Sequence, residues 1–490
     1  MLRAFTGSQV RDAERPLLER GMGRDLMARA AHGLYRSLVA ELRRTRGGLY
    51  GARVTAVVGK GNNGGDALFA LAELAGRGVR TTAILASGSA HTEGLAAFLA
   101  AGGRVERTLG RADIVVDAVL GTGASGDYRA PFPRPEGIVV ACDLPSGVDA
   151  DSGTASPEVW RADVTVTFGA LKSGLLAGRG RALAGRVEVI DIGIGEYLPQ
   201  PDVYVLEAED VRGVLPEPRD DWQKYTRGVL GVIAGSDQYP GAAVLTTSAA
   251  LATGVGMVRH IAPESVRRAV LAAHPEVVAS GSPEGRVQAW AVGPGIGDDA
   301  GQQSAFDVAL DSGLPIVVDA SGLNRIPGPP LDGRAVLTPH AGELARVLSR
   351  LGLDVERPEV EERPIRWARL AAERLGATVL LKGPATVCAA PDGTVCVQAV
   401  SHPYLATAGS GDTLTGIVGA LLATTSYARP VHVAAAAAMV HGRAGRIAAE
   451  GGPFGAGELS AAVRQAVAAF QGGVPEAPLG AAVDLPFAGR

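Results

Sequence analysis

The sequence predicts an α/β protein with two domains, each built on a mainly parallel sheet, and three observations support this prediction. Short runs rich in Val and Ile alternate with helical patterns, as in parallel strands that helices cover on both faces. This alternation stops in a proline-punctuated stretch between Gly193 and Gly228 and then starts again. The length of 490 residues also exceeds what one core supports, because cores stop growing near about 250–300 residues.

The first domain, expected over residues 1–210, begins with a helix and continues as strands separated by helices or loops. From Ser8 to about Leu42, apolar residues recur at spacings of three and four, which predicts one amphipathic helix. Further helices are expected in DALFALAEL, after the first strand, and at 93–101. The strands are expected in the runs RVTAVVG (53–59), VRTTAILA (79–86), ADIVVDAVLG (112–121), GIVVACDLPSG (137–147), DVTVTFG (163–169) and RVEVIDIGIG (186–195).

A linker is expected at 211–227, where prolines and the charged pair Asp220–Asp221 interrupt the pattern. The second domain, expected over 228–480, repeats the strand–loop–helix order. It opens with GVLGVIAGS (228–236) and a helix near Ala243–Val255. The elements that follow are the runs WAVGPGIG (290–297), LPIVVDAS (314–321), AVLTPH (335–340) and TVLLKG (378–383), a hairpin at Asp392–Gly393, and helices at Asp412–Ala423 and His432–Ala449.

The composition is that of a globular protein. Hydrophobic residues make up 47% and charged residues 20%, which excludes a disordered or collagen-like chain. Lys and Arg number 47 against 51 Asp and Glu, so the net charge of −4 provides no basic field for nucleic acid. Three cysteines, no signal peptide and no apolar run of about 18 residues argue against an oxidising compartment or a membrane. We expect a cytoplasmic homo-oligomer whose late Ala-, Leu- and Val-rich helices form core or subunit interface.

The loop Gly59–Asp66, GKGNNGGD, lies between a predicted strand and a predicted helix. Glycines let backbone amides face a ligand, and the helix start carries a partial positive charge, so a phosphate fits there. The loop is neither a dinucleotide fingerprint nor a Walker motif, and a glycine turn alone could be only a tight connection. Asn62, Asn63 and Asp66 add polar groups that such a connection does not need.

Two further strand ends carry polar clusters. Asp117 precedes GTGASGD (Gly121–Asp127), and Asp143 and Ser146 lie in CDLPSG. Each Asp by itself could be a cap or turn residue. In open parallel sheets, however, ligands bind beyond the carboxyl ends of the strands, so we expect the three loops to meet in one crevice.

Together these motifs resemble the NAD(P)H-hydrate epimerase domain, a Rossmann-like fold, over about residues 1–210. The resemblance implies R/S interconversion at the hydrated C6 of the nicotinamide ring, with Asp143 as the candidate acid–base group. It implies K⁺ held by Asn63, Asp117 and Ser146. Ser125 stands where some members have Lys, which leaves the acid–base assignment open, and Ala67 replaces a usual Gly. The implied substrate contacts are Asn62, Asn63, Gly64, Gly65, Asp66, Gly121, Thr122, Gly123, Ala124, Ser125, Gly126, Asp127 and Asp143.

In the second half, the strongest signal is TAGSGDTLTG (Thr407–Gly416) at the start of a predicted helix. Adjacent backbone amides there could stabilise a transferring phosphoryl group, and Asp412 could accept a proton from a substrate hydroxyl. The alternative is a plain Asp that the helix dipole stabilises. The segment is similar to the GxGD motif of ribokinase-like kinases.

Other blocks, including VGPGIG, VVDASGLN, TPHAGEL and LKGPATV, occur in the order of the NAD(P)H-hydrate dehydratase family over about residues 222–470. His340 in TPHAGEL could, by itself, be only a helix-start histidine. The resemblance implies a ribokinase-like domain that binds the hydrated nucleotide through Ala243, Gly295, His340 and Asp412, with Asp412 catalytic. It implies that ADP, with Mg²⁺, is bound by Lys382, Gly383, Pro384, Ala385, Thr386 and Gly411.

The two resemblances together predict a repair enzyme for hydrated NADH and NADPH. The first domain would supply the S epimer, and the second would phosphorylate its hydroxyl and expel phosphate, giving NAD(P)H and AMP. ADP is expected rather than ATP, because fusion of both domains is the prokaryotic arrangement. Two alternatives stay open: a ribokinase-like kinase of a small vitamin-precursor alcohol with a non-catalytic N-terminal binding domain, or a scaffold.

Overall fold

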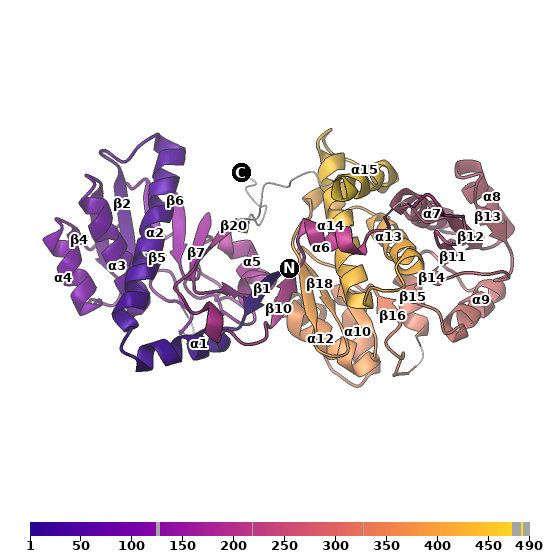
Figure 1. The fold of residues 1–490 in the computed structure, drawn as a ribbon, viewed down its shortest axis with the longest axis horizontal. Coiled ribbons are helices and arrows are strands. Elements are labelled where there is room, and N and C mark those ends of the chain that lie inside the picture. Colours follow the sequence, from indigo (N-terminus) through magenta and orange to yellow (C-terminus); the bar gives the residue numbers. More distant parts are fainter. Residues whose placement is uncertain (124–127, 218, 327, 473–481, 484–490) are drawn as a thin grey trace. The chain divides into compact units, whose positions relative to one another are not determined.

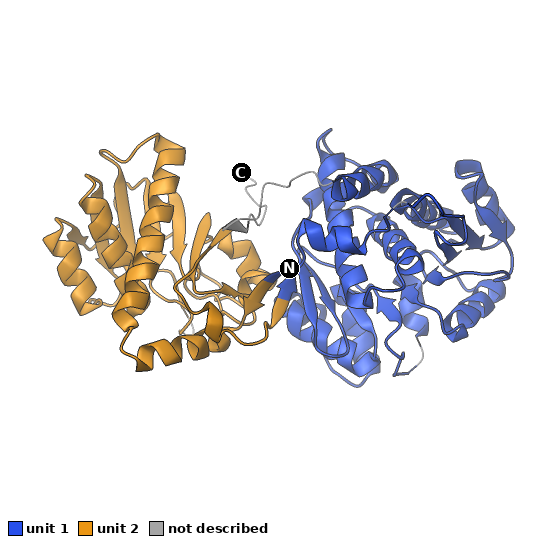
Figure 2. Ribbon diagram, viewed as in Figure 1, with its two compact units in different colours: residues 1–2, 204–476 blue, residues 3–203, 477–490 orange. Residues whose placement is uncertain are grey.

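The computed structural model describes residues 1–123, 128–217, 219–326, 328–472 and 482–483. The chain forms two compact units (Figure 2): an N-terminal unit of residues 3–203 with 482–483, and a C-terminal unit of residues 204–472 with 1–2. Sequence analysis placed a linker later, at 211–227. Helix α6 (Ala208–Val214) overlaps the start of that stretch, and its Val211 and Val214 are buried in the core of the C-terminal unit.

The N-terminal unit contains a twisted sheet in the order β20-β9-β7-β6-β5-β2-β3-β4 (Figure 1). All of its strand pairs are parallel except that of β20 with β9. A short parallel pair, β1 with β8, lies outside this sheet. The strands are β1 (Leu2–Phe5), β2 (Arg53–Val58), β3 (Arg80–Leu85), β4 (Arg104–Glu106), β5 (Ile114–Ala118), β6 (Ile138–Cys142), β7 (Val164–Phe168), β8 (Leu171–Lys172), β9 (Arg186–Ile190) and β20 (Ala482–Val483).

Alternating strand residues divide the N-terminal core between the two faces of this sheet. Val54, Ala56 and Val58 belong to a large cluster with the helices, whereas Val57 belongs to a smaller cluster around Trp160. The single helix expected from Ser8 to Leu42 is wrong, because the chain turns at Gly21, whose φ is +77°. The helices are α1 (Gly7–Glu19), α2 (Gly23–Arg46), α3 (Asn62–Ala75), α4 (Thr92–Ala100) and α5 (Gly178–Ala184).

The C-terminal unit has the strand order β13-β12-β11-β14-β15-β16-β17-β18-β19-β10. Strands are parallel from β13 to β17, and β17, β18 and β19 form an antiparallel meander whose turn contains the expected Asp392–Gly393. The strands are β10 (Val203–Val205), β11 (Val229–Ile233), β12 (Met257–Ile261), β13 (Val278–Ser280), β14 (Ala289–Val292), β15 (Ile316–Val318), β16 (Ala335–Leu337), β17 (Thr378–Leu381), β18 (Thr386–Ala389) and β19 (Val395–Gln398).

Helices α7, α13, α14 and α15 contribute most of the helical side of this core (Figure 1). Helix α14 is buried along most of its length, so its Ala-rich stretch is core. Within the described ranges, none of the helices has both the length and the apolar character needed to cross a membrane. The helices are α6, α7 (Pro240–Thr253), α8 (Glu264–Ala273), α9 (Ala300–Asp311), α10 (Ala341–Arg350), α11 (Arg357–Glu362), α12 (Pro364–Leu375), α13 (Ser410–Thr424), α14 (Pro430–Ala449) and α15 (Leu459–Gln471).

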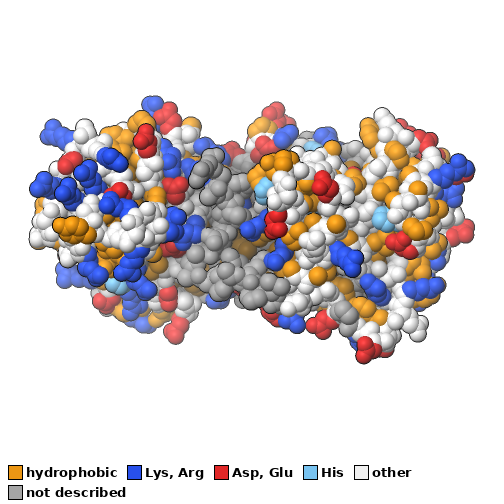
Figure 3. Space-filling model, turned by 90° about the horizontal axis from the view of Figure 1, so that it is seen from above, with side chains coloured by type: hydrophobic (Ala, Val, Ile, Leu, Met, Phe, Trp, Pro, Cys, Tyr) orange, Lys and Arg blue, Asp and Glu red, His pale blue; other side chains and the backbone are white. Residues whose placement is uncertain are grey.

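Basic and acidic side chains are interspersed over the face seen in Figure 3, on both units. This distribution agrees with the near-balanced composition of 47 basic and 51 acidic residues.

Candidate active sites

In the N-terminal unit, the three loops singled out in the sequence follow the neighbouring strands β2, β5 and β6 and lie together. Ser146 donates from its backbone N to Asp117 Oδ2 (2.9 Å) and from its hydroxyl to Asp117 Oδ1 (2.5 Å). Thr122 donates from its backbone N (2.8 Å) and its hydroxyl (2.6 Å) to Asp143 Oδ2. The structure therefore brings these four residues to one edge of the sheet.

The glycines of Gly59–Asp66 permit a close approach of the backbone. A Cβ on Gly64 would overlap the carbonyl oxygen of Gly59, and a Cβ on Gly59 would overlap that of Val119. Helix α3 begins at Asn62 without a side-chain cap, so its first amides are available to a ligand. Asn62 is exposed, whereas Gly64, Gly65 and Asp66 are buried. The loop thus has the geometry of an anion-binding turn.

The side chain of Asn63 is available to bind a ligand. Both polar atoms of its side-chain amide are buried, and neither has a hydrogen-bond partner within the described part of the chain. A Cβ on Gly121 would lie 3.2 Å from Asn63 Oδ1 and 3.0 Å from Asp143 Oδ2, so the amide faces the same crevice as Asp143. Asp117, 1% exposed, and Ser146 supply further oxygen atoms. Oxygen donors of this kind fit a hard cation such as K⁺.

Asp143 is held in an unusual conformation. Its φ of +67° lies in the left-handed region, which an Asp rarely occupies and which is typical of functional sites. Its Oδ1 accepts from the ammonium of Lys172 (2.7 Å) and from the hydroxyl of Thr167 (3.2 Å). Burial by itself would raise the pKa of Asp143, but Lys172 and the hydrogen bonds from Thr122 lower it. Asp143 is therefore a carboxylate at neutral pH.

Two other carboxyl groups lie near Asp143, and the pKa of each is raised rather than lowered. Burial, followed by the charges of Asp143 and Glu14, raises the pKa of Asp66 well above its ordinary value. Burial also raises the pKa of Glu14 on α1, against the effect of Lys172. Glu14 and Lys172 were not among the residues predicted from the sequence. Of the substrate-contact predictions, Gly121, Thr122 and Gly123 are on the crevice loop, whereas Ala124, Ser125, Gly126 and Asp127 lie outside the described residues.

In the C-terminal unit, helices α7 and α13 pack closely side by side. Gly416, in the second turn of α13, packs so closely on α7 that a Cβ would overlap the carbonyl of Thr246. Gly409, the N-cap of α13, has a φ of +86°, which permits the sharp entry to the helix. Ser410 Oγ lies 3.1 Å from Nε2 of His441, whose pKa burial lowers to about 4. A neutral histidine therefore supports the amide-lined start of α13.

Lys382 and Asp319 lie beside that helix start. Lys382 Nζ contacts Asp319 Oδ1 (2.7 Å) and Glu343 Oε2 (3.8 Å), and Asp319 Oδ2 accepts from the Thr415 hydroxyl of α13 (2.8 Å). A Cβ on Gly411 would lie 3.4 Å from Lys382 Nζ. Burial would lower the pKa of Lys382, but the two carboxylates raise it. Lys382 is thus a fixed cation close to where α13 begins.

Asp412 lies in the first turn of α13, and its environment is suited to proton transfer. Burial, and then the negative charge of Asp319, raises its pKa to about 6, against the opposing effect of Lys382. A carboxyl group with a pKa near the working pH can both accept and release a proton. Sequence analysis proposed Asp412 but missed Asp319.

His340 is the N-cap of α10. Its Nδ1 accepts from the backbone N of Gly342 (3.0 Å) and Glu343 (3.2 Å), so the helix-start role considered in the sequence is present. This capping role uses only Nδ1, and the His340 side chain is 52% exposed. The backbone N of Lys382 donates to Pro339 O (2.8 Å). This bond holds the segment before His340 beside the loop Lys382–Thr386, which connects β17 to β18. Of that loop, Gly383 and Pro384 are exposed, Thr386 is half-buried and Ala385 is buried.

Ala243 lies in the first turn of α7, whereas Gly295 follows β14, the strand that pairs with β11. A Cβ on Gly295 would lie 2.7 Å from Ala242, and one on Gly235 would lie 2.8 Å from Ala243. Gly235 N also donates to Pro294 O (2.8 Å), which joins the two loops. These residues therefore flank the start of α7, a helix whose Leu245 would be overlapped by a Cβ on Gly409, the N-cap of α13.

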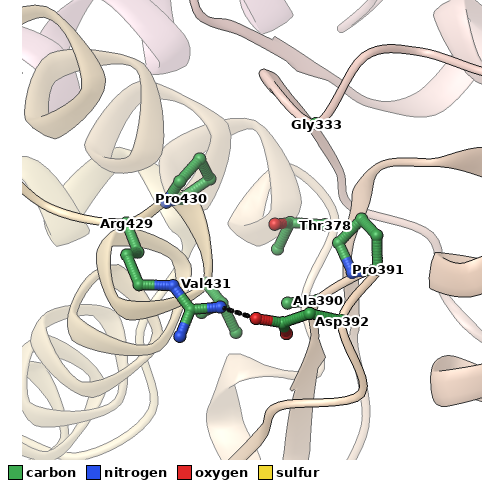
Figure 4. A pocket seen from close by; sticks show the side chains of 8 residues that line it. All are labelled: Gly333, Thr378, Ala390, Pro391, Asp392, Arg429, Pro430 and Val431. Atoms are coloured by element: carbon green, nitrogen blue, oxygen red, sulfur yellow. Dashed lines mark hydrogen bonds and ion pairs between the residues drawn. The ribbon is translucent and has the colours of Figure 1, made fainter.

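A pocket of about 220 Å³ lies elsewhere in this unit (Figure 4). Arg429 and Asp392 form an ion pair across it (2.5 Å). Thr378, which begins β17, is in its lining, whereas Lys382 follows the other end of that strand. The pocket therefore contains none of the predicted site residues.

Two family models match the chain. The model described as NAD(P)H-hydrate dehydratase matches residues 230–461, and the model described as YjeF-related protein N-terminus matches residues 23–174. Each range lies within one of the two units, and both resemblances found in the sequence are confirmed.

Relatives match over nearly the whole chain. The bifunctional NAD(P)H-hydrate repair enzyme Nnr of Mycobacterium tuberculosis is 45% identical over 440 residues, which covers 86% of this chain and 89% of the relative. The enzyme of the same name from Mycobacterium leprae is 43% identical over 489 residues, covering 95% and 99%. A crystal structure of ADP/ATP-dependent NAD(P)H-hydrate dehydratase from Bacillus subtilis, co-crystallised with ATP/Mg²⁺, is 30% identical with a TM-score of 0.50, and covers 55% of this chain and 99% of that one. The chain belongs to the family of bifunctional NAD(P)H-hydrate repair enzymes.

Proposed function

We propose that the C-terminal unit dehydrates the S hydrate of NADH or NADPH at the expense of ADP, giving NAD(P)H, AMP and phosphate. The observation that carries this proposal is the start of α13, where Gly409 turns the chain and Lys382 and Asp412 lie at the first amides. Asp412 takes the proton of the C6 hydroxyl, and that oxygen receives the phosphoryl group. Phosphate then leaves as the ring nitrogen donates electrons, and a C5 proton is lost to restore the ring double bond.

The other predicted contacts surround this chemistry. Ala243, Gly295 and His340 would bind the hydrated nicotinamide nucleotide, and Lys382–Thr386 with Gly411 would bind ADP. Asp319 and Glu343 both contact Lys382. Their carboxylate oxygens could hold Mg²⁺ together with the phosphates. A divalent cation supplies charge stabilisation for phosphoryl transfer.

The N-terminal unit, in this proposal, interconverts the R and S hydrates so that the whole damaged pool can be recovered. The loops Asn62–Asp66 and Gly121–Asp127 would hold the substrate, and Asp143 would act as the acid–base group at the hydrated carbon. Asn63, Asp117 and Ser146 would hold K⁺, which is supported by the buried, unpaired amide of Asn63 among the described residues. The cation would fix the loops that carry these residues.

A coupled absorbance assay tests both activities. Mixed R and S hydrates, K⁺ and Mg²⁺ are incubated with either ADP or ATP, and the reduced-nicotinamide absorbance is followed. Full recovery with ADP is expected. Asp412→Ala should abolish recovery while R/S exchange continues, and Asp143→Ala should limit recovery to the S fraction. Loss of both activities in either variant would contradict the assignment of one site to each unit.

The alternative, a kinase for a small vitamin-precursor alcohol with a non-catalytic first domain, is disfavoured by the family that the whole chain matches. It predicts a stable phosphorylated product and no R/S exchange. The expected homo-oligomer stays a prediction, which light scattering would check.

A further inference from the structure

Lys172 is a fully buried lysine at the epimerase crevice, with 1% of its side chain exposed. Its ammonium donates to Asp143 Oδ1 (2.7 Å), to the Thr167 hydroxyl (2.9 Å) and to the Phe168 carbonyl (2.7 Å). An ammonium has three N–H groups, so these acceptors satisfy all of them. Burial of an ammonium is costly unless it is paired and hydrogen-bonded, and Lys172 meets both conditions.

Together, Lys172 and Thr122 fix both oxygens of Asp143. Lys172 and Thr167 contact Oδ1, whereas the backbone and hydroxyl of Thr122 contact Oδ2. A residue with a left-handed backbone conformation persists where its surroundings hold it in place, and these contacts hold Asp143. The contacts to Oδ2 come from the predicted substrate loop, whereas those to Oδ1 come from Lys172 of β8 and Thr167 of β7.

Lys172 also distinguishes Asp143 from its acidic neighbours. Glu14 and Asp66 have raised pKa values, and only Asp143 of the three forms a hydrogen-bonded ion pair with Lys172. Carboxyl groups that lie close together cannot all be ionised, because their negative charges repel. The group that is paired with a cation is the one that ionises. The titratable groups around Asp143 and its neighbour Cys142 are Arg11 and Glu14 of α1, Asp66 of α3, Asp117 of β5 and Lys172 of β8.

We propose that Lys172 is a positioning residue of the epimerase: it holds the Asp143 carboxylate in the orientation that R/S exchange requires. This inference rests on the proposed function of Asp143.

The first test is Lys172→Met in the full-length chain, which removes the charge and keeps an unbranched apolar side chain. The kcat of R/S exchange should fall about 100-fold, as for loss of an acid–base group, while KM changes little. Dehydration of purified S hydrate by the other unit normalises the rate to the amount of active C-terminal unit, and circular dichroism compared with wild type checks that the N-terminal unit is folded. An unchanged kcat for exchange would overturn the inference.

A second pair of variants keeps the test decisive if Lys172→Met does not fold. Thr167→Val is nearly isosteric and removes one acceptor of Lys172 and one donor to Asp143. Thr165→Val is its matched control, since Thr165 is also fully buried on β7 but donates to Ala184 O (2.6 Å). Thr167→Val should lower kcat for exchange and Thr165→Val should not; equal kcat values in the two variants would contradict the proposal.

Chemical rescue separates positioning from packing. At saturating K⁺, methylammonium should restore exchange in Lys172→Ala but not in Asp143→Asn. Restored stability without restored kcat would show that Lys172 is only structural. A wild-type chain without any R/S exchange would contradict the proposed function itself, whereas exchange that survives Lys172→Met contradicts this inference alone.

Discussion

Replacing Asp412 with Asn is expected to stabilise the C-terminal unit while it removes the dehydratase activity. Burial and the charge of Asp319 raise the pKa of Asp412 from 3.8 to about 6. Between these two pH values, the folded chain keeps a proton on Asp412 that the unfolded chain has released. The free energy of unfolding therefore falls as pH rises through this window, and the loss is complete at neutral pH.

The size of this effect follows from the shift. A change of about 2 pKa units corresponds to about 3 kcal/mol, at roughly 1.4 kcal/mol per unit, which is an upper value for a group that is not completely buried. Asn has the same shape and no charge, so Asp412→Asn should gain up to this amount at pH 7.5 and nothing below pH 4. Catalytic sites often lower stability in this way.

Urea unfolding at pH 4 and pH 7.5, followed by tryptophan fluorescence, measures the gain. Trp222, Trp290 and Trp367 lie in the C-terminal unit and report mainly on it. Asp392→Asn is a control that should lower the free energy of unfolding at pH 7.5, because hydrogen bonds from Thr394 and the charge of Arg429 lower the pKa of Asp392. Equal urea midpoints for Asp412→Asn and wild type at pH 7.5 would refute the reasoning.

Three other predictions concern the two sites. The kcat/KM of dehydration should fall about tenfold for each pH unit below about 6, since Asp412 must be ionised to accept a proton. Asp319→Asn should move this fall to lower pH, because the charge of Asp319 raises the pKa of Asp412. A fall at the same pH in this variant would contradict the assignment. Gly64→Ala should lower R/S exchange about 100-fold, because its Cβ overlaps the Gly59 carbonyl, whereas Gly61→Ala, with open space around the new Cβ, should not; kinetics of both variants check this. Asn63→Ala should raise the K⁺ concentration needed for half-maximal exchange by at least about tenfold, with dehydration of S hydrate unaffected; an unchanged K⁺ titration would argue against the cation site.

The sequence predicted the strands that are buried on both faces, because runs such as Ile114–Ala118 have few polar interruptions. It did not predict β12, since Arg259 and His260 interrupt its apolar residues. The structure shows His260 buried with Nε2 on the Ala234 carbonyl (3.1 Å), a contact that no local pattern reveals. The break at Gly21 was missed because the apolar spacing continues across it.

The prediction of site residues was limited in the same way, because it rested on short stretches of neighbouring residues. Residues inside a motif, such as Asp143 and Asp412, were found because their neighbours form a recognisable loop. Glu14 and Lys172 act at these loops from other elements and belong to no quoted motif, whereas Asp319 lies in the quoted block VVDASGLN, where no local pattern distinguished it. One signal for Lys172 was available: it is one of only four lysines in a chain in which Arg supplies nearly all positive charge.

The stoichiometry of nucleotide cleavage tests the central claim most directly. With mixed hydrates and ADP, ³¹P NMR and absorbance should show one AMP and one phosphate for each NAD(P)H regained. Recovery of absorbance without ADP cleavage, or ADP cleavage that leaves the phosphoryl group on the product, would contradict dehydration through a phosphorylated hydroxyl.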